Sequence, residues 1–167
     1  MGCAFCRVVG TLNLHGYLRG YREDSSEEEV RGRRVYCSKR GRRGGCGHTF
    51  SVLLAGVIRG FRISAESLWR FLCNVAGGMS PQEALSTVLP TWTEAAGASL
   101  WRRFSAAQVH IRDLLLRVIA PPPCDSAVPA LHTIAHLLAA FPAAPCPISA
   151  FQMHFQTSLL PPITPRP

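Results

Sequence analysis

The sequence lacks the clustered carboxylates that metal-dependent nucleases and phosphotransferases require. After Ile63 it holds five acidic residues, and three of them, Glu66, Glu83 and Glu94, lie on or near the expected starts of helices, where capping explains them. Catalysis with two metal ions needs several carboxylates gathered at one point. The chain also lacks the ending of a P-loop and any paired nucleophile and base. We therefore expect a protein that is not an enzyme.

The sequence also lacks an apolar run long enough to cross a membrane. Residues 52–58 are apolar but few, and residues 126–165 carry no charged side chain but are interrupted by prolines and histidines before about 20 apolar residues accumulate. No secretory hydrophobic segment follows the first methionine, and the seven cysteines are odd in number. We expect no membrane partner and a reducing, cytoplasmic compartment, where paired cysteines more often hold metal than disulfides.

Four of the cysteines form two pairs. Cys3 and Cys6 have C-x2-C spacing, and Cys37 and Cys46 flank a turn rich in arginine and glycine. Structural zinc prefers four sulfur or nitrogen ligands in a tetrahedron, and two such pairs supply them. We therefore expect these four cysteines to bind one Zn2+. Two alternatives stay open: His48 in place of Cys46, and ordinary buried thiols without metal.

Positive charge is concentrated in the same part of the chain. Residues 1–62 hold twelve Lys and Arg against five Asp and Glu, whereas residues 63–167 hold six against five. Such a field suits a polyanion, although basic residues can also merely solvate a surface. The residues expected to neutralise phosphates are Arg31, Arg33, Arg34, Lys39, Arg40, Arg42 and Arg43.

The N-terminal part reads as short strands around the cysteine pairs. Residues 8–18 are rich in β-formers and predict a strand, a turn and a second strand. Residues 19–34 include the acidic run 23–29, which predicts an exposed loop. Two cysteine turns joined by short strands would make a zinc ribbon over residues 1–51.

Residues 60–119 predict three helices. Ser64 is a plausible N-cap, Ser80-Pro81-Gln82-Glu83 forms a capping box, and residues 91–94 offer another. A long helix over residues 93–119 carries one apolar seam. The seam consists of Leu100, Phe104, Ala107, Ile111, Leu114 and Val118. The layout is that of a helix-turn-helix, with two alternatives: a plain three-helix core, or a seam that forms a homodimer.

The last segment, residues 124–167, follows a proline linker and predicts two short uncharged helices that pack on each other, on the long helix or on a partner. One contains Leu131, Ile134, Leu138 and Phe141; the other contains Ile148, Phe151, Phe155 and Leu159. His132 and His136 are four residues apart, so a second metal site is an alternative to surface histidines. The predicted fold class is a small zinc ribbon of short β-structure followed by an all-α region, mainly α overall.

Residues 3–51 carry a family resemblance. The C-x2-C pair, the sequence RVYC at residues 34–37 and the sequence CGHTF at residues 46–50 resemble the zinc ribbon of bacterial insertion-sequence transposases. In that family the ribbon precedes a helix-turn-helix, and both bind the terminal DNA of the element. Two departures stand out: eight residues separate the second pair of cysteines, where the family has about two, and the first pair lacks the usual proline and glycine.

The resemblance extends to the third helix. Residues 99–104, SLWRRF, are similar to the end of a transposase recognition helix, which implies that Arg102 and Arg103 contact DNA backbone or base edges. The resemblance therefore implies a non-catalytic, zinc-dependent protein that binds duplex DNA, as an accessory, truncated or domesticated relative of a transposase. The alternatives are an RNA-binding zinc ribbon and a protein-interaction adaptor that uses the C-terminal helices.

Overall fold

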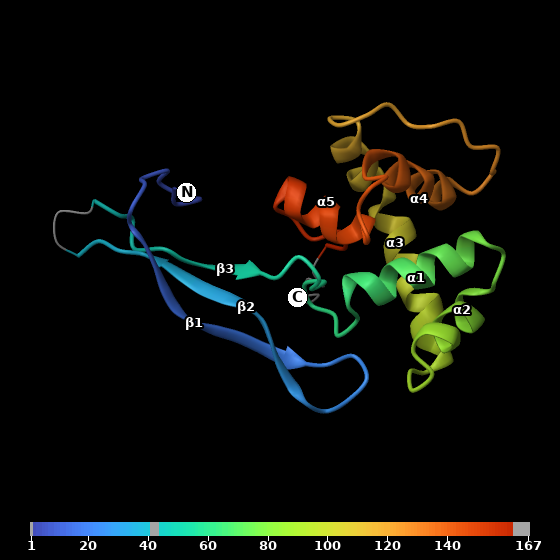
Figure 1. Cartoon of the computed structure of the whole chain (residues 1–167), viewed down its shortest axis with the longest axis horizontal. Coiled ribbons are helices and arrows are strands. Elements are labelled where there is room, and N and C mark those ends of the chain that lie inside the picture. Colours follow the sequence, from blue (N-terminus) through green and yellow to red (C-terminus); the bar gives the residue numbers. More distant parts are fainter. Residues whose placement is uncertain (1, 41–43, 162–167) are drawn as a thin grey trace, which may run out of the picture. The chain divides into compact units, whose positions relative to one another are not determined.

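The computed structural model describes residues 2–40 and 44–161 and divides into two compact units (Figure 1). The sheet unit is Met1–Leu54 and the helical unit is Ala55–Pro167. Within the described residues, a three-stranded antiparallel sheet precedes five helices, which confirms the expected short β region followed by helices. None of the described helices is long and apolar enough to span a bilayer.

The sheet unit contains β1 (Leu12–Tyr21), β2 (Glu28–Cys37) and β3 (Thr49–Leu53) in the order β1-β2-β3. The register places Leu14 opposite Val35, and Val35 opposite Phe50. Because side chains alternate between the two faces of a strand, these three residues share one face. With their neighbours they line an apolar groove of about 410 Å³. Tyr36 and Thr49, which pair with each other, belong to the opposite face.

The expected loop over residues 19–34 is wrong, because most of it is strand. β1 continues to Tyr21 and β2 begins at Glu28, so only the turn between them remains as loop. Acidic residues have low strand propensity, but opposite charges at diagonal positions of an antiparallel pair can interact favourably. Arg19 Nη1 lies 3.9 Å from Glu28 Oε2 across this hairpin. The acidic run 23–29 therefore lies partly in the turn and partly in β2.

The helical unit contains α1 (Ala65–Ala76), α2 (Pro81–Val88), α3 (Glu94–Leu115), α4 (Pro129–Ala140) and α5 (Pro147–Phe155). The Ser64 side chain accepts a hydrogen bond from Ser67 N–H, which confirms the predicted N-cap of α1. The capping box of Ser80 and Glu83 is also confirmed. The second capping box is wrong, because α3 begins after Thr93 without a side-chain cap.

One hydrophobic core joins all five of these helices, from Ile58 to Leu160. In α3 the seam residues Leu100, Phe104 and Ile111 are buried in this core. The helix ends at Leu115, four residues before the predicted end, and Val118 is exposed. The sequence left three packing partners open for the two C-terminal helices: each other, the long helix or another protein. In the structure α4 and α5 pack into the core of α1 to α3. A homodimer through the long helix stays a prediction.

Gly97 explains how α2 and α3 approach each other. The sequence suggests that this glycine weakens the helix. In the structure it is buried against α2, and an added Cβ would collide with the carbonyl oxygen of Pro81. The absence of a side chain at residue 97 therefore permits close packing of the two helices.

Candidate metal centre

Four cysteine sulfurs converge at one end of the sheet unit. Cys3 and Cys6 come from the N-terminal turn, Cys37 is the last residue of β2, and Cys46 precedes β3. All four sulfurs lie within 4.8 Å of one another. Cys3 Sγ is 3.6 Å from Cys46 Sγ, and Cys6 Sγ is 3.7 Å from Cys37 Sγ. Residues far apart in the sequence thus form one cluster.

These sulfur distances fit a single metal ion. A Zn–S bond of about 2.3 Å in a regular tetrahedron places the sulfurs about 3.8 Å apart. A disulfide would bring two sulfurs to about 2.05 Å, so all four cysteines are free thiols. The cluster could therefore hold one metal ion, and a tetrahedral set of four sulfurs is typical of zinc or iron.

The first cysteine pair lies in a tight turn. Arg7 N–H donates to the Cys3 carbonyl at 2.9 Å, and Cys3 N–H donates to the Val8 carbonyl at 3.1 Å. Arg7 has a φ of 62°, a left-handed conformation that glycine adopts more readily. The missing glycine of the first pair therefore does not prevent the turn from closing, because Arg7 takes up the strained backbone conformation.

The second cysteine pair closes despite its longer spacing. Cys37 N–H donates to the His48 carbonyl and Gly47 N–H donates to the Cys37 carbonyl, both at 2.9 Å. Gly47 has a φ of 77°. At Gly45 a Cβ would collide with the Ser38 carbonyl and lie 2.9 Å from Cys37 Sγ. Glycines at these two positions let the chain return to Cys37, so the eight intervening residues are compatible with the cluster.

Hydrogen bonds to sulfur favour thiolates at two of the cysteines. The Thr11 hydroxyl lies 3.2 Å from Cys37 Sγ and lowers the pKa of this thiol to about 6, and Cys46 N–H assists at 3.3 Å. A hydrogen bond from the Cys6 backbone lowers the pKa of Cys3. Sequence reasoning missed Thr11, since no spacing marks a hydroxyl that supports a sulfur ligand.

The pKa of Cys46 shows what a cation would contribute to the cluster. The backbone N–H of His48 lowers the pKa of Cys46, but burial and the neighbouring sulfurs of Cys3, Cys37 and Cys6 outweigh it and raise this pKa to about 11. Four thiolates cannot coexist at this spacing without a compensating positive charge. A divalent metal ion supplies that charge and allows all four sulfurs to be deprotonated together.

His48 is not positioned to replace Cys46 as a ligand. The candidate metal cluster consists of the four cysteines, and the His48 ring stacks on Phe5 with centroids 4.6 Å apart and an interplanar angle of 18°. The two other histidines considered as ligands bond to backbone carbonyls: His132 Nε2 to Ser126 at 2.6 Å, and His136 Nε2 to Ile119 at 2.9 Å. Both rings therefore have structural partners.

Four of the predicted phosphate-binding cations are exposed: Arg33, Arg34, Lys39 and Arg40. Within residues 2–40 and 44–161 none of them forms an ion pair with a carboxylate. Arg33 lies over the Tyr17 ring, 4.5 Å from its centroid. Arg42 and Arg43 lie outside the described residues.

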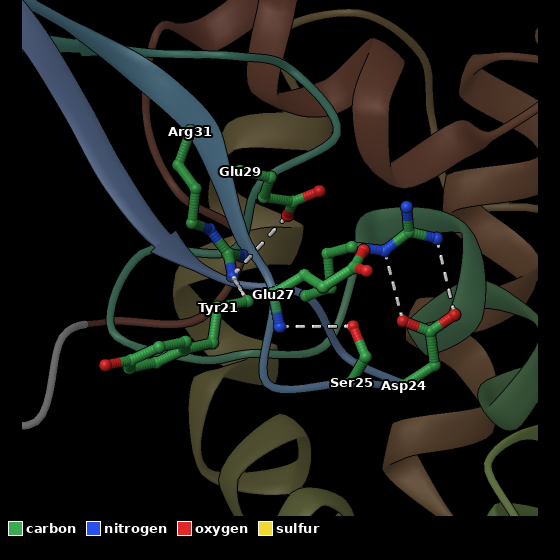
Figure 2. Close-up of polar contacts among 7 residues, drawn as sticks. Tyr21, Asp24, Ser25, Glu27, Glu29 and Arg31 are labelled. Carbon is green, nitrogen blue, oxygen red and sulfur yellow. Dashed lines mark hydrogen bonds and ion pairs between the residues drawn. The ribbon is translucent and has the colours of Figure 1, made fainter.

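Phosphate binding by Arg31 stays a prediction, and the structure does not favour it because this side chain is engaged within the hairpin. Arg31 follows Val30 at a register shift of the hairpin and is only 8% exposed. Its Nη1 donates to the Tyr21 carbonyl at 3.0 Å and lies 3.9 Å from a Glu29 carboxylate oxygen, as Figure 2 shows. The β-bulge directs this side chain into the hairpin, so Arg31 stabilises the turn end of the sheet.

Arg102 and Arg103 lie within α3, more than two turns after its start at Glu94. Arg102 is exposed. Arg103 is half-buried, and its guanidinium lies 5.2 Å from the centroid of the Phe61 ring. Recognition helices generally contact bases from their N-terminal residues. DNA contact by these two arginines stays a prediction, and Arg103 already has a partner within the helical unit.

Comparison with protein-family models, curated proteins and solved structures finds no match. The resemblance to transposase ribbons therefore stays a prediction from the motifs at residues 3–51.

Proposed function

We propose that this protein is a non-catalytic, zinc-dependent protein that binds duplex DNA. The observation that carries the proposal is the four-sulfur cluster next to a strand and turn whose exposed cations have no carboxylate partners among the described residues. Zinc is the metal that four thiolates at this spacing most commonly hold in a structural site. A transposase-related accessory, truncated or domesticated protein would have this combination.

The distribution of charge within the sheet unit supports a polyanion partner. All five carboxylates of this unit lie in residues 23–29. Three of them form ion pairs near the turn, with Arg19, Arg22 and Arg31. Among the described residues, the exposed cations near the four cysteines therefore have no carboxylate partner.

A zinc ion bound by the four cysteines would not neutralise all of the positive charge around it. A zinc ion with four thiolates carries a net charge of −2, which attracts nearby cations. The exposed cations of β2 and the cysteine turns outnumber that charge: Arg7, Arg33, Arg34, Lys39 and Arg40. This excess of positive charge favours phosphate binding by these cations over a role limited to neutralising the metal centre.

The adaptor alternative loses much of the surface on which it depends, although Leu138 of α4 and Met153 of α5 stay exposed. It requires apolar residues of the C-terminal helices to be available for a partner. Ile134 and Leu137 of α4 and Ile148 and Phe151 of α5 are buried in the core of the helical unit. Nucleic-acid binding is therefore the better supported function.

The test is the salt dependence of duplex binding, measured by fluorescence anisotropy. Each neutralised phosphate contributes about −0.9 to the slope of log affinity against log salt. The variant Arg34→Ala/Lys39→Ala/Arg40→Ala should therefore flatten the slope by about 2–3. The matched control is Arg19→Ala/Arg22→Ala, which removes two arginines of the same unit that pair with carboxylates. This control should leave the slope nearly unchanged.

Three results would contradict the proposal: no duplex binding at low salt, an equal slope change in both variants, or binding that survives metal removal. RNA and single-stranded competitors address the remaining alternative. If RNA displaces the duplex at equal concentration, the protein is an RNA-binding ribbon instead.

A further inference from the structure

We propose that the metal centre assembles a stacking surface for an unpaired nucleobase, and that Phe5 is the residue on which the base stacks. This inference rests on the proposed function, because it identifies the part of the nucleic acid that the sheet unit would contact besides phosphate. The surface, here called the aromatic platform, consists of Phe5, His48 and Phe50.

The platform combines two separate stretches of chain. Phe5 lies between the ligands Cys3 and Cys6, and His48 follows Cys46 by two residues. The two rings stack in nearly parallel planes, with centroids 4.6 Å apart. Phe50 supports them from β3, its ring centroid 6.1 Å from that of Phe5 and tilted by 59°.

Hydrogen bonds tie the backbone beside both rings to the cysteine ligands. Phe5 N–H donates to Cys3 Sγ at 3.4 Å, and the His48 carbonyl accepts from Cys37 N–H at 2.9 Å. Cys3 Sγ and Cys46 Sγ lie 3.6 Å apart. A metal ion that binds both sulfurs therefore also holds the two rings together, and removing it should disperse the platform.

Phe5 exposes more ring surface than its role in packing explains. The residue is 57% exposed although one face of its ring is stacked on His48. Leaving apolar surface in water is unfavourable by about 25 cal/mol per Å². An exposed aromatic ring held rigidly beside cations is typical of surfaces on which unpaired bases stack.

The charge beside the platform favours a nucleobase over a cationic ligand. The Lys39 side chain runs along Gly47, where an added Cβ would lie 3.2 Å from Lys39 Nζ. Gly47 directly precedes His48, so this ammonium lies near the backbone that carries the platform, where the phosphate of a stacked nucleotide would find a cation. The same ammonium would repel a methylated lysine, the other common ligand of aromatic surfaces.

The test compares three probes on the full chain: a blunt duplex, the same duplex with one extrahelical fluorescent aminopurine, and a single strand that contains aminopurine. The wild-type protein should bind the duplex with the extrahelical base about tenfold more tightly than the blunt duplex, and should quench the aminopurine. Phe5→Leu should abolish both effects while leaving blunt-duplex affinity, its salt slope and the zinc content unchanged.

Two further variants keep the test specific. Phe5→Tyr retains an aromatic ring and should retain the preference and the quenching. Tyr17→Leu removes another exposed aromatic residue of the same unit and should change neither.

The outcomes separate this inference from the proposed function. If the wild-type protein binds the blunt duplex but shows no preference for the extrahelical base, the inference is wrong and the proposed function stands. If it binds none of the probes, both are wrong. If Phe5→Leu and Phe5→Tyr both lose zinc, Phe5 has a structural role and the inference is overturned.

Discussion

The sheet unit and the helical unit have different sources of stability. Among the described residues of the sheet unit, the buried apolar side chains are Cys3, Val35 and Cys37. The helical unit instead buries a continuous set of large side chains, including Phe71, Phe104 and Phe151. Apolar burial can stabilise the second unit but not the first, whose size is small for an independent core.

The difference in burial predicts that only the sheet unit depends on metal for folding. In the sheet unit, Leu14 and Tyr17 stay more than half exposed, and the apolar groove stays open. Metal binding would have to supply the missing free energy, so this unit should fold only with its ligand. The helical unit should be indifferent to metal.

Metal removal should have the largest effect. Cys37→Ser, or a strong chelator, should unfold the sheet unit and leave the helical unit folded, because structural zinc contributes about 10–16 kcal/mol of binding free energy. Amide NMR spectra would record the two sets of resonances separately. Cys73→Ser is the control, since Cys73 is an exposed thiol of α1 outside the cluster. Simultaneous loss of both sets of resonances would show that the helical unit does not fold independently of the metal.

Truncation of the helical core should have the reverse effect. Phe104 is fully buried, so Phe104→Ala should destabilise the helical unit by about 3–5 kcal/mol in denaturant titrations. The zinc content of the chain should not change. Val109→Ala, at an exposed position of the same helix, should stay within about 0.5 kcal/mol. Loss of zinc in Phe104→Ala would show that the two units are not independent.

Gly97→Ala tests the close packing of α2 and α3. In an exposed helix interior this change would stabilise by about 1 kcal/mol. Because the added Cβ would meet the Pro81 carbonyl, we expect destabilisation of about 1–3 kcal/mol instead. Ala106→Gly, at an exposed position of α3, should cost about 1 kcal/mol from propensity alone. A higher melting temperature in Gly97→Ala would contradict the packing account.

The capping box of α2 should give the smallest effect. Ser80→Ala should destabilise the helical unit by about 1 kcal/mol. Hydrogen bonds from the Ser80 side chain and backbone also lower the pKa of Glu83 from its usual 4.5. Ionised Glu83 therefore stabilises the fold above that value, and the contribution is lost as pH falls through the lower, folded pKa. Glu83→Gln should reduce the loss of thermal stability at acidic pH. An unchanged pH dependence of the melting temperature would contradict the role of Glu83 in this capping box.

Local signals in the sequence predicted the helix starts well. Ser64 and Ser80 cap their helices as expected, because a side-chain cap depends on only a few neighbouring residues. The convergence of Cys3, Cys6, Cys37 and Cys46 was also predictable, since two spaced pairs of cysteines are the pattern that a four-sulfur metal site requires.

Features that depend on distant residues were not predictable. The strands over residues 19–21 and 28–34 form through pairing across the hairpin, which local propensity does not report. The burial of Arg31 within the hairpin was not predictable, because a β-bulge leaves no mark in composition. From the sequence, Gly97 was expected only to weaken α3. Its role in close packing becomes apparent only once the position of Pro81 in α2 is known.

The most direct test of the central claim is native mass spectrometry combined with thiol alkylation of the full chain. The account predicts one zinc ion per chain, with Cys3, Cys6, Cys37 and Cys46 protected from alkylation and Cys73 modified. After chelation, the four cysteines should become reactive and one zinc mass should be lost. A metal-free chain in which all four cysteines react as readily as Cys73 would contradict the account.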